Sequence, residues 1–90
     1  MSKIEVRKPT KEELQKMKVK EWPIWECEPS TFPYEYDDKE TCYILDGDVT
    51  VTTPTGDVHF QKGDLVVFPK GLKCQWNVAK HVRKHYRFGD

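Results

Sequence analysis

The strongest constraint on the fold is a succession of short segments in which polar and apolar residues alternate. These segments are rich in β-branched and aromatic residues and are separated by turn residues about every ten positions. Side chains alternate across a strand, so each such segment has one face available for burial. About eight segments after residue 21 follow this rhythm, which is typical of a β-sandwich or barrel. The expected strands are residues 3–7, 22–28, 32–36, 41–45, 49–53, 58–61, 65–68, 72–78 and 82–88.

Turn and capping motifs divide the chain further. Asp46-Gly47-Asp48 predicts a tight hairpin turn, residues 54–57 (Pro-Thr-Gly-Asp) predict a second one, and residues 80–82 are expected in a loop. Residues 10–13 (Thr-Lys-Glu-Glu) form a capping-box pattern that predicts the one helix. We therefore expect an all-β barrel in a single domain of residues 1–90, in which residues 1–20 pack on a barrel of residues 21–88.

Composition excludes several classes of protein. Fifteen basic and fifteen acidic residues cancel, which argues against nucleic-acid binding. No segment approaches the roughly 20 apolar residues of a membrane span, and the N-terminus does not resemble a signal peptide. Cys27, Cys42 and Cys74 are odd in number and lack a CxxC motif, so free thiols in the cytoplasm are expected.

Residues 63–74 resemble the second conserved motif of the cupin superfamily. Gly63, Pro69 and Gly71 have the spacing of that motif, and Cys74 stands where cupins have a metal-binding histidine. The first motif is matched by Glu40 and Gly47. Its two histidine positions are filled by other residues, which are Tyr34 and Tyr36 or, with a longer gap, Pro33 and Glu35.

The narrower resemblance is to small single-domain cupins grouped with the cupin domain of (S)-ureidoglycine aminohydrolase. It is carried by Trp25-Glu26, residues 40–47, residues 63–71, Trp76 and residues 82–86. The resemblance implies a jelly-roll barrel, also called a double-stranded β-helix. It also implies metal-assisted hydrolysis of a ureido compound, but that chemistry relies on histidines that this chain replaces.

The alignment and the side-chain alternation together predict the contents of the barrel. Alternating residues of a strand share a face, so three inward faces are expected to line a pocket, with Trp25 as part of its apolar wall. The six other expected lining residues are Tyr34, Tyr36, Glu40, Cys42, Cys74 and Trp76.

The two inward cysteines have more than one interpretation. Buried cysteines often act as small hydrophobic residues. Alternatively, Glu40, Cys42 and Cys74 offer three ligands for zinc, or for the iron or manganese of related folds. A reactive thiol or an oxidisable pair is a third interpretation. The sequence itself requires no cofactor.

Glu40 is the main candidate for chemistry. An unpaired inward carboxylate is costly, so we expect it to accept hydrogen bonds from Tyr34 or Tyr36, to have a raised pKa, or to pair with a cation of a ligand. If the protein is an enzyme, Glu40 is the candidate general acid or base, with Tyr34 and Tyr36 positioning it and Tyr36 as the second catalytic candidate. Of the histidines, His59 and His81 are expected in solvent. His85 is expected to face outward or, if the register of its strand is reversed, to join Arg83 as a polar pair near the pocket mouth.

Three functions fit these observations. The first is a small-molecule-binding cupin of unassigned specificity, catalytic or not. The second is a non-catalytic interaction module, in which Tyr43 and Leu45 form an apolar outer strip suited to a homodimer. The third is a metal-binding cupin that uses Glu40 and Cys74.

Overall fold

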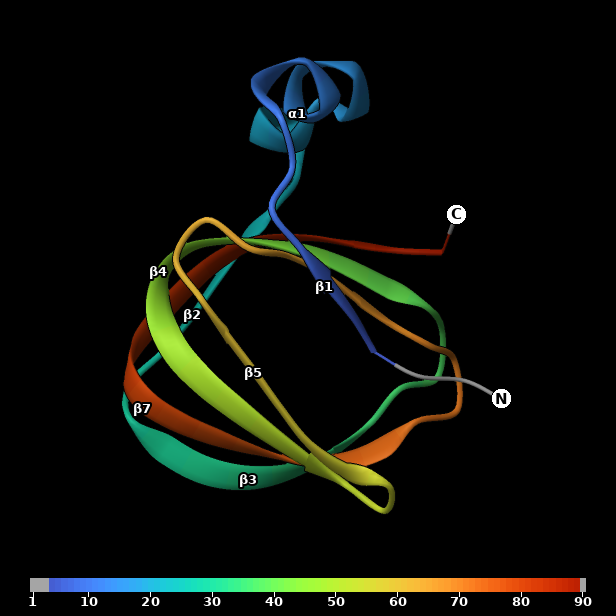
Figure 1. The fold of residues 1–90 in the computed structure, drawn as a ribbon, viewed down its shortest axis with the longest axis vertical. Coiled ribbons are helices and arrows are strands. Elements are labelled where there is room, and N and C mark those ends of the chain that lie inside the picture. Colours follow the sequence, from blue (N-terminus) through green and yellow to red (C-terminus); the bar gives the residue numbers. More distant parts are fainter. Residues whose placement is uncertain (1–3, 90) are drawn as a thin grey trace.

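The computed structural model describes residues 4–89. In this range the strands curve around a common interior, and the helical segment lies at one end of the molecule (Figure 1). The elements are, in chain order, β1 (Glu5–Arg7), α1 (Lys11–Met17), the 3₁₀ helix η1 (Val19–Glu21), β2 (Ile24–Cys27), β3 (Ser30–Glu35), β4 (Glu40–Thr53), β5 (Gly56–Gln61), β6 (Leu65–Phe68) and β7 (Lys73–Phe88).

The strands form one antiparallel sheet that is organised around its two longest members. β4 and β7 pair with each other, and the main path of the sheet is β1-β6-β4-β7-β2. β3 pairs with the first half of β7, β2 pairs with its second half, and β5 pairs with the second half of β4. The expected all-β barrel with a short N-terminal helix is thereby confirmed.

The predicted hairpin turn at residues 46–48 is wrong, because β4 runs through this segment without interruption. Its pairing with β7 shifts register between Ile44 and Val49, and such bulges bend a strand without ending it. Gly47 has a φ angle of +120°, and a Cβ atom there would lie 2.8 Å from the Cα atom of Val82. Glycine is therefore required by the close approach of β7 and not by a hairpin.

The predicted loop at residues 80–82 is also wrong. β7 continues through these residues, and Lys80 pairs with Asp48 in β4. β4 and β7 thus each replace two of the predicted strands. The second hairpin turn is confirmed, since Pro54 and Thr55 connect β4 to β5.

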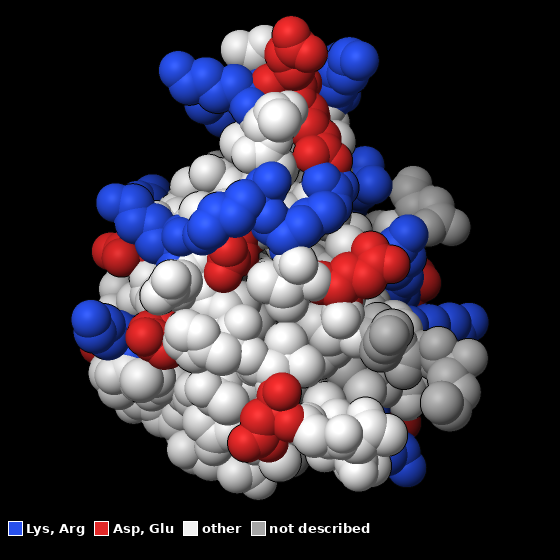
Figure 2. Space-filling model, viewed as in Figure 1, with Lys and Arg blue, Asp and Glu red and all other residues white. Residues whose placement is uncertain are grey.

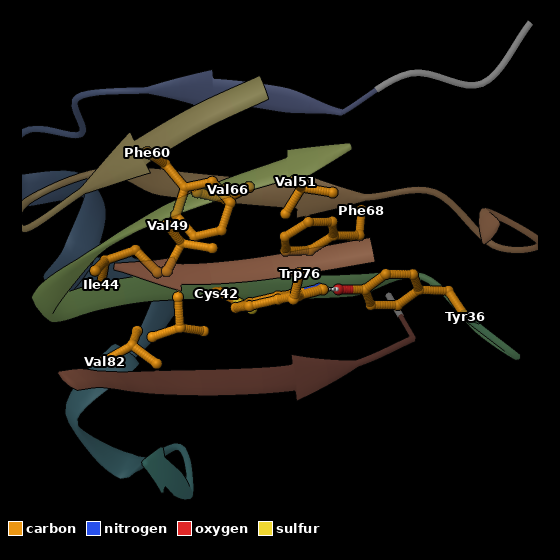
Figure 3. Close-up of a cluster of buried hydrophobic side chains, with 11 residues drawn as sticks. Tyr36, Cys42, Ile44, Val49, Val51, Phe60, Val66, Phe68, Trp76 and Val82 are labelled. Atoms are coloured by element: carbon orange, nitrogen blue, oxygen red, sulfur yellow. Dashed lines mark hydrogen bonds between the residues drawn. The ribbon is translucent and has the colours of Figure 1, made fainter. Parts of the chain in front are cut away.

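The barrel interior is filled by apolar side chains. Figure 3 shows Ile44 and Val82 at one end of this cluster, Tyr36 at the other end and Trp76 beside it. The ring of Phe68 stacks on Tyr36 with 4.7 Å between centroids and lies 5.6 Å from Trp76. We give the name apolar core to six residues of this cluster that are 0% exposed and do not line the pocket described below: Ile44, Val49, Val51, Phe60, Val66 and Val82.

The N-terminal segment has two differently placed parts. β1 pairs with β6 at an edge of the sheet, whereas α1 buries none of its residues and projects beyond the barrel (Figure 1). The predicted cap is confirmed, because Thr10 Oγ1 accepts a hydrogen bond from the Glu13 amide at 3.2 Å. Charged side chains gather around this end on the face shown in Figure 2, while the lower barrel wall carries few. Neither helix within residues 4–89 has the length and apolar character needed to cross a membrane.

Candidate functional site

A pocket of about 160 Å³ opens into the barrel beside Trp76. Four strands contribute to its wall: β2, β3, β4 and β7. Tyr34 and Phe88 are well exposed and lie at its mouth, whereas Glu40 and Lys84 are buried in it. The lining residues are Trp25, Phe32, Tyr34, Tyr36, Glu40, Trp76, Lys84, Tyr86 and Phe88.

Strand register brings these side chains to one place. Glu40 at the start of β4 pairs with Phe88 at the end of β7, and Cys42 pairs with Tyr86. Inward side chains recur at every second position, so β7 presents Lys84, Tyr86 and Phe88 on one face. The polar end of the pocket is therefore built from the two central strands and not from loops.

Glu40 and Lys84 form a buried ion pair. The Lys84 Nζ atom donates to Glu40 Oε2 at 3.1 Å, and their side chains are only 5–6% exposed. The same ammonium donates to Cys42 Sγ at 3.3 Å and lies 4.7 Å from the ring centroid of Trp76 and 5.0 Å from that of Trp25. Sulfur, carboxylate and aromatic faces together surround the cation, as is usual for a charge removed from water.

The environment determines which groups of this cluster are charged. Burial works against the charged form of Lys84, but the Glu40 carboxylate and the hydrogen bonds to Glu40 and Cys42 outweigh it, so the pKa of Lys84 is raised and the ammonium persists. Burial also raises the pKa of the Cys42 thiol to about 12, with Lys84 acting in the opposite direction. At neutral pH, Cys42 is therefore a protonated thiol beside the Glu40–Lys84 ion pair.

Tyr36 holds the aromatic wall in position. It is 1% exposed, and its hydroxyl accepts a hydrogen bond from Trp76 Nε1 at 3.2 Å. Burial, followed by the nearby Glu40 carboxylate, raises the pKa of Tyr36, so the phenol keeps its proton. Its chemical contribution is hydrogen bonding and orientation. The pKa of Tyr34 is raised by burial as well, although this ring lies at the mouth.

The residues present do not fit a metal centre of the kind that the cupin resemblance implies. Within residues 4–89, no three His, Cys, Asp or Glu side chains are grouped closely enough to hold a metal ion. An ammonium also occupies the space between Glu40 and Cys42, two of the three predicted zinc ligands. A second cation beside Lys84 would be repelled.

The structure separates the residues predicted for the site into two groups. Tyr34, Tyr36, Glu40, Trp76 and Trp25 line the pocket. The two cysteines do not belong to its lining: Cys42 is fully buried behind the ion pair, and Cys74 is half-buried with a pKa raised by burial.

The hydrogen-bond partners of Glu40 differ from the expected ones. Among the described residues its partners are Lys84 and the Cys42 thiol, and not Tyr34 or Tyr36. Sequence reasoning missed Lys84, although alternation along β7 places it on the same face as Tyr86 and Phe88. The available signal was a lysine on the same inward strand face as two aromatic residues.

The histidines lie outside the pocket. His59 and His81 are exposed, as predicted, and face Asp48 and Glu26 at 2.8 and 3.3 Å. His85 points away from the pocket but is only 8% exposed, because the segment before β2 covers it. Its Nδ1 atom lies 2.9 Å from the Trp22 carbonyl oxygen.

Residues 14–86 match the family model described as EutQ-like cupin domain. A crystal structure of a DUF861 family protein from Thermotoga maritima is similar to the chain with 52% identity and a TM-score of 0.95, covering 97% of this chain and all of that one. The EutQ protein of Clostridium difficile is 28% identical over 72% of this chain, with a TM-score of 0.67. A putative ethanolamine utilization protein Q from Salmonella typhimurium is 22% identical over 72% of this chain, also with a TM-score of 0.67.

The chain spans about half the length of these two longer proteins, with 52% and 53% of them covered. No curated protein matches the sequence. The matches confirm the predicted cupin superfamily, but they do not confirm the narrower resemblance to ureidoglycine aminohydrolase.

Proposed function

The chain belongs to the family of EutQ-like cupin domains, and from this premise we propose that its barrel binds a compact polar organic molecule in the pocket between β2, β3, β4 and β7. Glu40 and Lys84 contact the polar end of this molecule. Trp25, Trp76 and Tyr86 surround its apolar part, and Tyr36 orients Trp76 through their hydrogen bond.

The observation that carries the proposal is the buried Glu40–Lys84 pair facing a hollow. Taking two charges out of water is expensive, and a well-packed apolar pair is often as stable or more stable. The rest of the barrel interior is apolar and filled. A charged pair beside unfilled space is therefore explained better by ligand recognition than by stability.

A thermal-shift panel tests this proposal directly. Compact amides, carboxylates, amines and polyols are added separately to the purified protein, and the unfolding midpoint is measured. A ligand at about one hundred times its dissociation constant stabilises the folded state by about 2.7 kcal/mol, which raises the midpoint of a small domain by roughly 10–20 °C.

Two matched variants assign the effect to the pocket. Glu40→Gln is expected to abolish the shift produced by the best compound, because it leaves Lys84 without its anionic partner. Glu35→Gln makes the same chemical change at an exposed position of β3 and is expected to retain the shift. A panel without any stabilising compound, or equal shifts in both variants, contradicts the proposal.

A further inference from the structure

The charge balance of the pocket restricts the ligand that it accepts, given the proposed binding function. Of its nine lining residues, Glu40 and Lys84 are the two that carry charge, and these charges cancel. An ionic ligand would add an uncompensated charge to a site that is otherwise walled by aromatic rings, which is unfavourable. The charge balance therefore favours an uncharged ligand.

The remaining hydrogen-bonding capacity of the pair defines the polar head group. An ammonium has three N–H donors, and the described acceptors Glu40 Oε2 and Cys42 Sγ use two of them. A carboxylate has about four acceptor sites, of which the Lys84 ammonium and the Cys42 thiol use two. One side of the pocket therefore offers a donor next to an acceptor, with Nζ and Oε2 only 3.1 Å apart.

A carboxamide matches this arrangement. Its carbonyl oxygen accepts from Lys84 while its N–H group donates to Glu40, and both atoms are attached to one carbon. A carboxylate lacks the donor and an ammonium lacks the acceptor, and each of them also carries a charge. The amide is the one group of the three that satisfies both residues without adding charge.

The walls and the volume indicate the body of the ligand. Phe32 and Trp76 are stacked with an interplanar angle of 13°, and Trp25 meets Trp76 edge to face at 72°. The volume of about 160 Å³ is close to the roughly 150 Å³ of an apolar cavity that holds one benzene molecule. A flat apolar body the size of a single ring fits this space.

We infer that the pocket recognises an uncharged molecule whose head group presents a hydrogen-bond acceptor and a donor on one carbon, such as a carboxamide, on a body no larger than one ring. The inference rests on the proposed function and refines it. Glu40 and Lys84 are the residues that determine this specificity.

Three probes of similar size, each with one phenyl ring, test the inference: benzamide, benzoate and benzylammonium. Their dissociation constants for the unmodified protein are measured by calorimetry at one pH and salt concentration. Benzamide is expected to bind at least about tenfold more tightly than either ion, a difference of about 1.4 kcal/mol. In Glu40→Gln the pocket becomes cationic and the preference is expected to move toward benzoate, while in Lys84→Met it is expected to move toward benzylammonium.

The outcomes separate the inference from the proposed function. If benzoate or benzylammonium binds the unmodified protein as tightly as benzamide, the inference is overturned while ligand binding stands. The same holds if another compound of the panel binds and benzamide does not. If neither the probes nor the panel bind, both are overturned. The comparison of the three probes needs no variant, so it stands even if a substitution prevents folding.

Discussion

The pocket and the apolar core lie in the same barrel interior, but equivalent inward positions of the strands carry different kinds of side chain in the two regions. Along β7, the inward residue Val82 is completely buried among apolar side chains, whereas Lys84, two positions later, carries a charge. Along β4, Glu40 and Cys42 likewise precede Val49 and Val51. One end of each central strand is used for packing and the other for a polar site.

This difference separates the inward side chains that stabilise the barrel from those that its stability does not require. Apolar burial stabilises a fold in proportion to the area removed from water, and the apolar core supplies it. The ion pair contributes little net stability after its desolvation cost. Inward residues that are charged therefore indicate the functional end of the barrel.

The largest expected effect contrasts a phenylalanine of the apolar core with one at the pocket mouth. Phe60→Ala removes a ring that is 0% exposed and is expected to lower the free energy of unfolding by about 3–5 kcal/mol. Phe88→Ala removes a ring that is 47% exposed and is expected to cost less than about 1 kcal/mol. Urea denaturation measures both, and equal losses would remove the distinction between the two regions.

A double-mutant cycle on the ion pair sharpens the comparison. Lys84→Met leaves Glu40 buried without a partner and is expected to cost about 3 kcal/mol or more. Combining it with Glu40→Leu is expected to recover most of that loss, because an apolar pair replaces both charges. The free energy of unfolding of the two single variants and the double variant gives the coupling. Additive losses would mean that the two side chains are not coupled in the folded protein.

The smallest expected effect concerns the thiol behind the pocket. The pKa of Cys42 is 9.0 in its unperturbed state and about 12 in the folded protein. Between these values the unfolded chain binds fewer protons than the folded one, so stability falls as pH rises, by at most about 1.4 kcal/mol per pH unit for this group. The raised pKa of Lys84 acts in the same direction, since its stabilisation is lost as the ammonium deprotonates.

Urea denaturation at a series of pH values from about 8 to 11 measures this dependence of stability on pH. Cys42→Ala is expected to have a shallower alkaline decline than the unmodified protein, whatever its stability at neutral pH. Cys27→Ala, which changes a cysteine outside the pocket, is expected to keep the original slope. An unchanged slope in Cys42→Ala would show that this thiol titrates normally and lies in a more polar environment.

Prediction from the sequence succeeded for the direction of side chains along a strand and failed for the positions at which two strands were expected to end. Alternation correctly placed Glu40, Cys42 and Trp76 inside the barrel, because inward and outward positions are a local property of a strand. The breaks predicted at residues 46–48 and 80–82 failed for a nonlocal reason. An Asp-Gly pair favours a hairpin in isolation, but here Gly47 accommodates the backbone of β7.

The sequence by itself determined the all-β class, the inward faces of the strands and the helix cap, because each depends on residues close together in the chain. Only the tertiary structure decided that Glu40 meets Lys84, which follows it by 44 positions. Their meeting depends on the register of β4 against β7, which shifts at the bulges near Gly47. A register of this kind is set by the packing of the whole barrel, so the ion pair and the pocket around it emerge only when the sheet closes.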